Sequence, residues 1–358
     1  MSKLETKDFL ATADVTVVDA MKRLDKTAKG VIFIIDSNKT LIGSVSDGDI
    51  RRWVIKTGDL MGQARSFMHE KTKCLTEKER DKAESYMKTH HIRVVPILNE
   101  ERKVIDIIFD TDVMSRTAKK EKGDLSTTSV IIMAGGKGTR LYPYTKILPK
   151  PLIPIGDVPI IERIIDKFCE YNIVDFHMTV NYKKAMIKSY FTDLEPKYNV
   201  SYVEEDKPLG TAGSIRLIHK KFHSPVIVTN CDILVNADYA NIMKHHKKSG
   251  NAMTIVSALK NVIVPYGVLR SKEDGIITSM EEKPSLSYLV NTGMYVINPE
   301  IIEMIQEDTY FHMPDLADKL MKVKLQVGMY PISEDSFFDM GEFEEMHRME
   351  EKLNQGVE

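Results

Sequence analysis

The second part of the chain alternates between continuous apolar runs and segments with apolar residues at helical spacing. The runs predict strands at 130–133, 176–180, 200–203, 225–230 and 252–259. The spaced segments predict helices at 159–171, 183–191, 212–222, 237–248 and 341–353. This order predicts an α/β domain with a largely parallel central sheet, which binds ligands at the carboxyl ends of its strands.

The first part of the chain contains an internal repeat. VIFIIDSNKTLIGSVSDGDI begins at Val31 and VVPILNEERKVIDIIFDTDV begins at Val94, an offset of 63 residues. Each copy reads as strand, polar turn, strand and acidic helix start, and a helix-type segment precedes it. We therefore expect two units, about 1–60 and 64–117, that bury their sheet faces against each other.

A polar, charged stretch separates the repeat from the α/β part. Residues 118–128 are short of large apolar groups, which is typical of a linker, so the second module is expected to cover 129–358.

Composition and charge exclude several classes of protein. Hydrophobic residues make up 42% of the 358 residues, enough for more than one core. Lys and Arg number 50 against 52 Asp and Glu, so we expect no nucleic-acid partner. The early apolar run Val31–Ile35 is far shorter than the ~20 residues of a membrane span, and the first ten residues do not resemble a secretory signal. Three scattered cysteines fit reduced thiols, so we predict a cytoplasmic protein without a membrane partner.

A glycine-rich turn follows the strand predicted at 130–133. Its glycines are Gly135, Gly136 and Gly138. Such glycines let backbone N–H groups approach a phosphate, and Arg140 and Lys150 can add positive charge. No GxxxxGK(S/T) P-loop can be written here, and Leu141 occupies the third glycine position of a dinucleotide-binding GxGxxG motif.

The flanks of this turn carry a more specific pattern. GGKGTRLYPYTKILPKPL resembles the signature GGxGTRLxPxTxxxPKPL of the sugar-nucleotide pyrophosphorylases, nucleotidyltransferases that act on sugar 1-phosphates. The resemblance spans Ser129 to about Leu353 and implies a Rossmann-like domain with a mixed, mainly parallel sheet. It implies catalytic roles for Arg140 at the β- and γ-phosphates and for Lys150 near the α-phosphate. It also implies nucleotide binding by Ala134, Gly135, Gly136, Gly138, Thr139, Glu205, Gly210 and Thr211.

EEDKPLGTAGS, residues 204–214, resembles the nucleobase loop of that family, in which Gly210 would let the base lie against the backbone. Glu205 occupies the expected base-reading position. An ionised Glu only accepts hydrogen bonds, and guanine offers two adjacent donors, whereas uracil and thymine offer one. This chemistry favours GTP over dTTP or UTP.

Two acidic segments resemble the metal-binding motifs of the family. VTNCDIL (228–234) and FFDMGEFEEM (337–346) would place Asp232 and Asp339 on Mg²⁺, the expected cofactor.

Three further segments resemble the sugar side of the family: PYGVLR (265–270), MEEKPS (280–285) and VNTGMYVIN (290–298). By this resemblance Lys283 would be a catalytic residue that binds the phosphate of the sugar. The sugar itself would contact Tyr266, Gly267, Glu282, Asn291 and Thr292.

The N-terminal repeat resembles a tandem pair of cystathionine-β-synthase (CBS) domains, an α+β fold, over about 1–117. A Ser/Thr-x-x-Asp motif binds adenine nucleotides in that family. The first copy matches with Ser46 and Asp49, whereas the second has Phe109 in place of the hydroxyl and keeps Asp112. We expect at most one intact nucleotide site. A pair that only mediates assembly into a dimer or tetramer remains an alternative.

The resemblances together imply transfer of a nucleotidyl group from an NTP to a hexose or hexosamine 1-phosphate, with release of pyrophosphate. A CBS pair followed by a nucleotidyltransferase looks most like the guanylyltransferases of bacterial legionaminic acid pathways, which implies glucosamine 1-phosphate or its N-acetyl form. A mannose-1-phosphate guanylyltransferase and a dTDP- or CDP-glucose-type pyrophosphorylase are the alternative enzymes. A nucleotide-sensing regulatory scaffold without catalysis is the alternative from another class.

Overall fold

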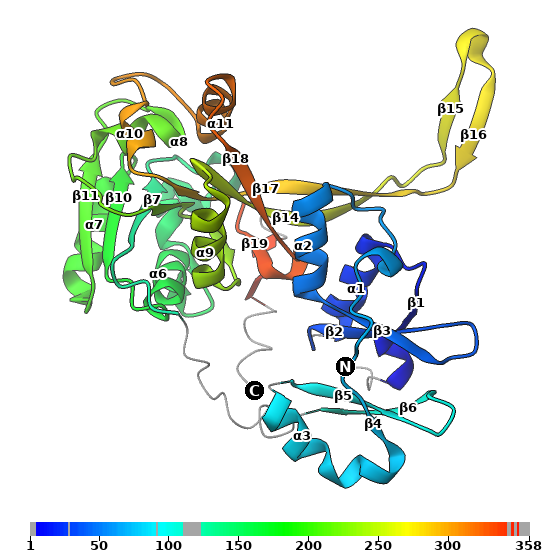
Figure 1. Cartoon of the computed structure of the whole chain (residues 1–358). Helices are drawn as coiled ribbons and strands as arrows, with labels where there is room; N and C mark the ends of the chain where they lie inside the picture. The colour runs from blue at the N-terminus through cyan, green and yellow to red at the C-terminus, as the bar shows by residue number, and fades with distance from the viewer. Residues whose placement is uncertain are drawn as a thin grey trace. The chain divides into compact units, whose positions relative to one another are not determined.

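The structure is a computed structural model that describes residues 5–27, 29–90, 92–109, 123–341, 345–346 and 349–350 (Figure 1). The chain divides into two compact units. The first comprises Met1–Lys120 and Leu259–Leu289, and the second comprises Glu121–Ala258 and Val290–Glu358.

The N-terminal residues are organised around two small three-stranded sheets. The first sheet has the order β1-β2-β3, with strands β1 (Leu10–Thr12), β2 (Val31–Ile35) and β3 (Leu41–Ser46), and it is accompanied by helices α1 (Val17–Thr27) and α2 (Asp47–Thr57). The second sheet has the order β4-β5-β6, with strands β4 (Leu75–Thr76), β5 (Val94–Leu98) and β6 (Val104–Phe109), and it is accompanied by helix α3 (Ala83–His90). Residues of both sheets share one apolar cluster, in which Phe33 and Leu41 pack with Val94, Leu98 and Ile107.

The turn between the last two strands is built in the same way in both sheets. Asp36 Oδ1 accepts hydrogen bonds from the backbone amides two and four residues further on, at 2.9 and 2.8 Å. Asn99 Oδ1 makes the same two bonds at 3.1 and 2.9 Å. Either side chain can close such a turn, which explains why an acid and an amide alternate at this position of the repeat.

Residues of the segment Leu259–Leu289 form a two-stranded antiparallel ribbon. Its strands are β15 (Val268–Ser271) and β16 (Ile277–Glu281). Every residue of β16 is exposed.

A seven-stranded sheet with the order β11-β10-β7-β12-β17-β14-β18 forms the centre of the second unit. Its strands are β7 (Ser129–Ala134), β10 (Asp175–Val180), β11 (Asn199–Glu204), β12 (Val226–Asn230), β14 (Met253–Ile263), β17 (Ser285–Ile297) and β18 (Val327–Ile332). The first four strands of the sheet run parallel, and β17 is antiparallel to β12. This mixed, mainly parallel sheet confirms the predicted fold class.

Helices cover both faces of this sheet (Figure 1). Side chains of β7 alternate, so that Val130 and Ile132 pack on one face and Ile131 and Met133 on the other. The first face packs against α6 (Ile160–Cys169), α7 (Lys184–Leu194) and α9 (Tyr239–Ser249). The second packs against α8 (Gly210–Gly213), α10 (Glu300–Glu303) and α11 (Met313–Lys322). Burial on both faces explains why the strands appear as continuous apolar runs.

The helix predicted at 212–222 is wrong in its second half. Only α8 and a 3-10 turn over Ser214–Leu217 form. Ile218, directly after this turn, is buried and extended, and the chain then leads toward β12. The helix predicted at 341–353 falls largely outside the described residues.

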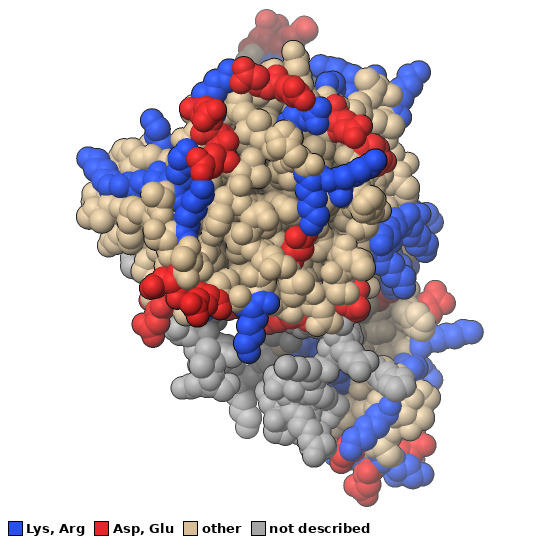
Figure 2. Space-filling model, turned by 90° about the vertical axis from the view of Figure 1, so that its left-hand side faces the viewer, with Lys and Arg blue, Asp and Glu red and all other residues tan. Residues whose placement is uncertain are grey.

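The surface carries charges of both signs. On the face drawn in Figure 2, Lys and Arg lie among Asp and Glu around a broad area without charged side chains. Within the described ranges, no helix combines the length and the apolar character needed to cross a membrane.

Candidate active site

A cavity of about 390 Å³ opens at the carboxyl ends of β7, β10 and β12. The chain passes from β7 to β10 on one side of β7 and later returns to β12 on its other side, so the cavity lies where the strand order reverses. Ten of the predicted site residues line the cavity, and they are Gly135, Gly136, Gly138, Thr139, Arg140, Lys150, Glu205, Gly210, Thr211 and Asp232.

The glycine-rich turn is packed closely on one side and open on the other. A Cβ atom at Gly135 would lie 2.4 Å from Glu205 Oε1, and one at Gly138, where φ is +64°, would lie 2.9 Å from Thr145 Cγ2. A Cβ at Gly136 would meet nothing within 4 Å. The backbone at Gly136 is therefore accessible to a ligand. Ala134, the last residue of β7, is buried in the core instead.

Charged side chains converge at one end of the cavity. The ammonium group of Lys150 forms an ion pair with Asp232, and both side chains are largely buried. Asp339 ends β19 (Phe337–Asp339), which pairs with β13 (Ile233–Val235) so that Asp339 lies opposite the residue after Asp232. Burial and the negative charge of Asp232 raise the pKa of Asp339, while Lys150 and Arg140 oppose this shift.

The two carboxylates suit a hard divalent cation. Both donor groups are oxygens, and the pKa of Asp339 is raised first by burial and second by the negative charge of Asp232. In the described part of the chain, no group of three or more His, Cys, Asp or Glu residues could hold a metal. Two carboxylates completed by phosphate oxygens and water are, however, a common arrangement for Mg²⁺.

The opposite end of the cavity contains Glu205. Its side chain is 6% exposed, and Oε2 accepts a hydrogen bond of 3.1 Å from the backbone amide of Leu209. Burial raises the pKa of Glu205, and the Leu209 amide opposes that shift. The neighbouring Glu204 pairs instead with Lys184 and Lys188. Hydrogen bonds from these two lysines lower the pKa of Glu204 to about 2. Of these two acids, only Glu205 lines the cavity.

Gly210 has a structural reason to be glycine. Its φ is +77°, and a Cβ there would lie 2.6 Å from the carbonyl oxygen of Phe311. The nucleobase loop thus rests on a segment about 100 residues further along the chain. Gly210 also lines the cavity, and its contact with the base stays a prediction.

Gly210→Ala is expected to lower the free energy of unfolding of this unit by about 2–4 kcal/mol, from left-handed strain and the Phe311 contact together. Gly250→Ala is the matched control: its φ is +65°, but nothing lies within 4 Å of its Cβ position. Strain alone should cost about 1–2 kcal/mol there. Thermal unfolding followed by circular dichroism measures the loss of stability in both variants. Equal losses would show that the Phe311 contact contributes nothing.

Several side chains of the cavity were not predicted. They are Thr179, Ser214, Asn230, Cys231, Tyr310 and His312. Asn230 and Cys231 directly precede Asp232, so their position after a predicted strand was a usable signal. Tyr310 and His312 had no such signal, because only the fold brings His312 to Thr211, and Tyr310 is hydrogen-bonded to His312.

The predicted sugar-side residues fall into two groups. Tyr266, Gly267, Glu282 and Lys283 belong to the segment that carries the ribbon, and none of them lines the cavity. Gly267 and Glu282 do lie together, since a Cβ at Gly267 would be 2.9 Å from Glu282 Oε2.

Asn291 and Thr292 lie on β17 in the second unit. Asn291 Nδ2 donates to the hydroxyl of Tyr295 at 2.8 Å. Thr292 is 2% exposed, and its hydroxyl donates to the carbonyl of Val256 at 2.8 Å.

Of the predicted CBS nucleotide residues, Ser46 and Asp49 form the cap of α2. Ser46 Oγ donates to Asp49 Oδ2 at 2.6 Å and accepts from the Asp49 amide at 3.3 Å. Ser46 also lines a cavity of about 590 Å³, together with Lys71 and Arg93. Asp112 lies outside the described residues.

Comparison with known proteins gives two family matches. Residues 129–356 match the model of the nucleotidyl transferase family, and residues 2–56 match the model of the CBS domain. Two similar relatives are mannose-1-phosphate guanyltransferases. The one from Debaryomyces hansenii is 34% identical over 185 residues, which cover 49% of this chain and 51% of that protein. The one from Candida albicans is 35% identical over 185 residues, with the same coverage of both chains. The chain thus spans about half the length of the curated relatives it matches.

Among solved structures, HddC from Yersinia pseudotuberculosis is similar with a TM-score of 0.51 and 27% identity. The match covers 63% of this chain and 99% of that one. The family match extends over more than half of the chain and includes the glycine-rich turn, both acidic segments and the nucleobase loop. The predicted family is thereby confirmed, and the chain belongs to the nucleotidyl transferase family.

Proposed function

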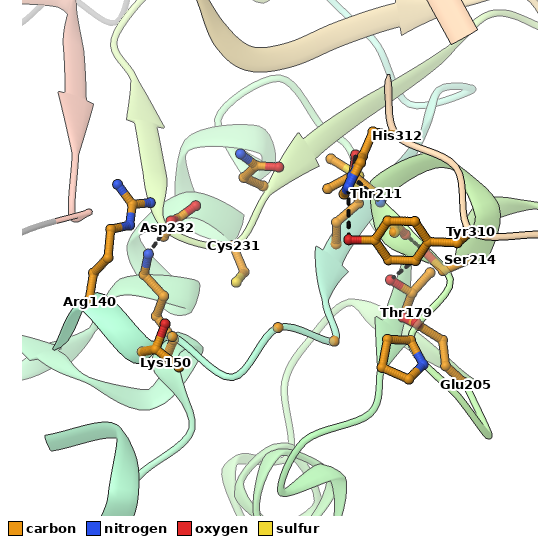
Figure 3. A pocket seen from close by; sticks show the side chains of 18 residues that line it. Arg140, Lys150, Thr179, Glu205, Thr211, Ser214, Cys231, Asp232, Tyr310 and His312 are labelled. Carbon is orange, nitrogen blue, oxygen red and sulfur yellow. Dashed lines mark hydrogen bonds and ion pairs between the residues drawn. The ribbon is translucent and has the colours of Figure 1, made fainter. Parts of the chain in front are cut away.

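We propose that the protein transfers a guanylyl group from GTP to a sugar 1-phosphate and releases pyrophosphate, giving a GDP-sugar. The observation that carries this proposal is the polarity of the cavity. Glu205 lies at one end, and Arg140, Lys150 and Asp232 lie at the other (Figure 3). Such a cavity suits a ligand with a base at one end and phosphates at the other.

The reaction needs little from the protein besides positioning and charge. A phosphate oxygen of the sugar 1-phosphate attacks the α-phosphorus in line, the bond from that phosphorus to the bridging oxygen breaks, and pyrophosphate leaves with the electron pair. The attacking phosphate is already anionic near pH 7, so no general base is required. Lys150 would neutralise charge near the α-phosphate and Arg140 at the β- and γ-phosphates. Asp232 and Asp339 would hold Mg²⁺, which would supply further charge neutralisation when bound.

The preference for GTP rests on Glu205. One carboxylate oxygen is held by the Leu209 amide, and Oε1 lies beside the Gly135 backbone at the cavity wall. A fixed carboxylate suits the paired N1–H and 2-amino donors of guanine. Its buried position makes a base without these donors costly to accept.

Glu205→Gln is expected to reduce the preference for GTP over dTTP and UTP by about 10- to 100-fold, because a hydrogen bond to a charged group is lost. The measurement is kcat/KM for each nucleotide. Glu204→Gln is the matched control, since Glu204 is paired with Lys184 and Lys188 and does not line the cavity. An unchanged preference in Glu205→Gln would contradict the assignment of the base end.

For the acceptor, we propose glucosamine 1-phosphate or its N-acetyl form, as in legionaminic acid pathways. Lys283 is the residue predicted to bind its phosphate, and the residues predicted to contact the sugar are Tyr266, Gly267, Glu282, Asn291 and Thr292. Mannose 1-phosphate is the second candidate, because the relatives at 34% and 35% identity are named for it.

Pyrophosphate release with Mg²⁺ tests this proposal. GTP, dTTP, UTP and CTP are each combined with glucosamine, N-acetylglucosamine, mannose and glucose 1-phosphates. Turnover confined to GTP supports the guanylyl transfer, and the sugar with the highest kcat/KM identifies the acceptor. A preference for dTTP, UTP or CTP would agree with the nucleotidyltransferase class but contradict the proposed preference for guanine. No turnover with any pair would favour the regulatory scaffold.

For the N-terminal residues, we propose that the cavity beside Ser46 binds the phosphates of an adenine nucleotide. Lys71 and Arg93 line it and supply positive charge. A ligand that binds only the folded state raises the melting temperature, so ATP and AMP should each be tested by thermal shift, with Arg93→Ala as the comparison. No shift with either nucleotide would favour a role in assembly alone, as a dimer or tetramer.

A further inference from the structure

The segment 309–313 is fixed against the nucleobase loop by its backbone. The Phe311 amide donates to the carbonyl of Leu209 at 2.8 Å, and the Phe311 carbonyl accepts from the amides of Ala212 and Gly213 at 2.9 and 3.0 Å. Phe311 itself packs against the apolar core. Its two neighbours, Tyr310 and His312, line the cavity instead. Backbone bonds thus hold an aromatic pair at the wall of the cavity.

The hydrogen bonds of His312 fix its tautomer. The backbone amide of Thr211 donates to His312 Nδ1 at 3.3 Å, and an amide can only donate. Nδ1 is therefore the acceptor, and the proton of the neutral ring resides on Nε2. Nε2 lies 3.0 Å from the hydroxyl oxygen of Tyr310, to which it must donate.

This chain of bonds leaves the Tyr310 hydroxyl with its own hydrogen available. Its oxygen accepts from His312, so the phenol proton must be directed to another acceptor. Figure 3 shows the Tyr310 hydroxyl turned from its backbone toward the cavity, at the end that also contains Glu205 and Thr179. Tyr310 is 63% exposed, so a ligand can reach it. The wall therefore presents a hydrogen-bond donor at the end of the cavity that contains Glu205.

The Tyr310 hydroxyl as donor and the Glu205 carboxylate as acceptor, at the same end of the cavity, match one edge of guanine. Guanine presents its O6 acceptor next to the N1–H donor, whereas adenine presents an amino group at position 6. We infer that Tyr310 donates to O6 of the bound guanine, with His312 and Thr211 as positioning residues, and so selects a keto purine over an amino purine. This inference rests on the proposed transfer from GTP and adds a specificity residue to it.

The test compares GTP with 6-thio-GTP, which keeps N1–H and the 2-amino group but has a weakly accepting sulfur in place of O6. In the wild type, kcat/KM should be about 3- to 10-fold higher for GTP. Tyr310→Phe should lower the value for GTP by a similar factor and leave that for 6-thio-GTP unchanged. Tyr86→Phe is the control, since Tyr86 stacks on His90 in the N-terminal unit and lies outside the cavity.

His312→Asn tests the positioning role, because Asn remains a good cap for α11 but cannot hold the Tyr310 hydroxyl. It should lower the GTP to 6-thio-GTP ratio as Tyr310→Phe does, and the double variant should show no further loss. If His312 had a merely structural role, His312→Asn would lower kcat/KM for GTP and for 6-thio-GTP by the same factor.

Calorimetric binding of both nucleotides separates this inference from the proposed function. A wild type that binds GTP but makes no GDP-sugar defeats the proposed function, and the binding ratio still tests Tyr310. A wild type that makes GDP-sugar, together with an unchanged GTP to 6-thio-GTP ratio in Tyr310→Phe, overturns the inference alone. Failure of the wild type to bind GTP overturns both.

Discussion

Asp232→Asn is expected to lower kcat for GDP-sugar formation by at least about 100-fold. The amide keeps the shape of the side chain but removes one of two carboxylates at the phosphate end, together with the ion pair to Lys150. Asp339 alone would then face the cation that both residues are proposed to hold. The measurement is steady-state pyrophosphate release at saturating GTP and Mg²⁺.

Asp193→Asn provides the control for this change, since Asp193 is an exposed residue of α7 outside the cavity. It should retain wild-type kcat. A melting temperature of Asp232→Asn close to that of the wild type would show that the loss is chemical. Unchanged kcat in a folded Asp232→Asn would exclude this carboxylate from the reaction.

Lys150→Met is expected to lower kcat/KM for GTP by about 100- to 1000-fold. Lys150 is 7% exposed, so its charge acts in a poorly screened environment beside Asp232. Without it, the two carboxylates lose a compensating cation, and the pKa of Asp339 should rise further. Kinetics at varied GTP concentration measure the loss.

Lys146→Met is the matched control, because Lys146 lies in the same segment but over the ring of Tyr142, 5.5 Å from its centroid, and not in the cavity. Since Lys150 and Asp232 act as a pair, the double variant Lys150→Met/Asp232→Asn should lose much less than the product of the single losses. Full multiplicativity would show that the two residues act independently.

Most of the site could be predicted because its residues follow directly after strands. The run before Gly135 identifies β7, and Asp232 follows β12 in the same way. Parallel strands bring these ends to one sheet edge, which agrees with Gly136 and Asp232 lining one cavity. The family resemblance was needed to predict Asp232 as a metal ligand and Lys150 as a catalytic residue. The family resemblance added Glu205, which local chemistry alone would not distinguish from Glu204.

What could not be predicted depends on contacts between distant segments. The aromatic wall forms only because Phe311 bonds to the loop around Gly210, and no periodicity in the sequence indicates that contact. The helix predicted at 212–222 is wrong beyond Leu217, where the chain turns extended at Ile218, and the apolar spacing of Ile215 and Ile218 did not reveal this end because it fits a helix equally well. The exposed ribbon that includes β16 likewise has no separate signature in the residue pattern.

The most direct test of the central claim is a competition assay. Equal concentrations of GTP, dTTP, UTP and CTP are supplied together with Mg²⁺ and glucosamine 1-phosphate, and the sugar nucleotides formed are quantified by anion-exchange chromatography and mass spectrometry. Parallel reactions contain N-acetylglucosamine 1-phosphate or mannose 1-phosphate. Guanylyl transfer predicts that the GDP-sugar dominates the products with the preferred sugar and that Glu205→Gln shifts the mixture toward other bases. A dominant dTDP-, UDP- or CDP-sugar from the wild type would contradict the account.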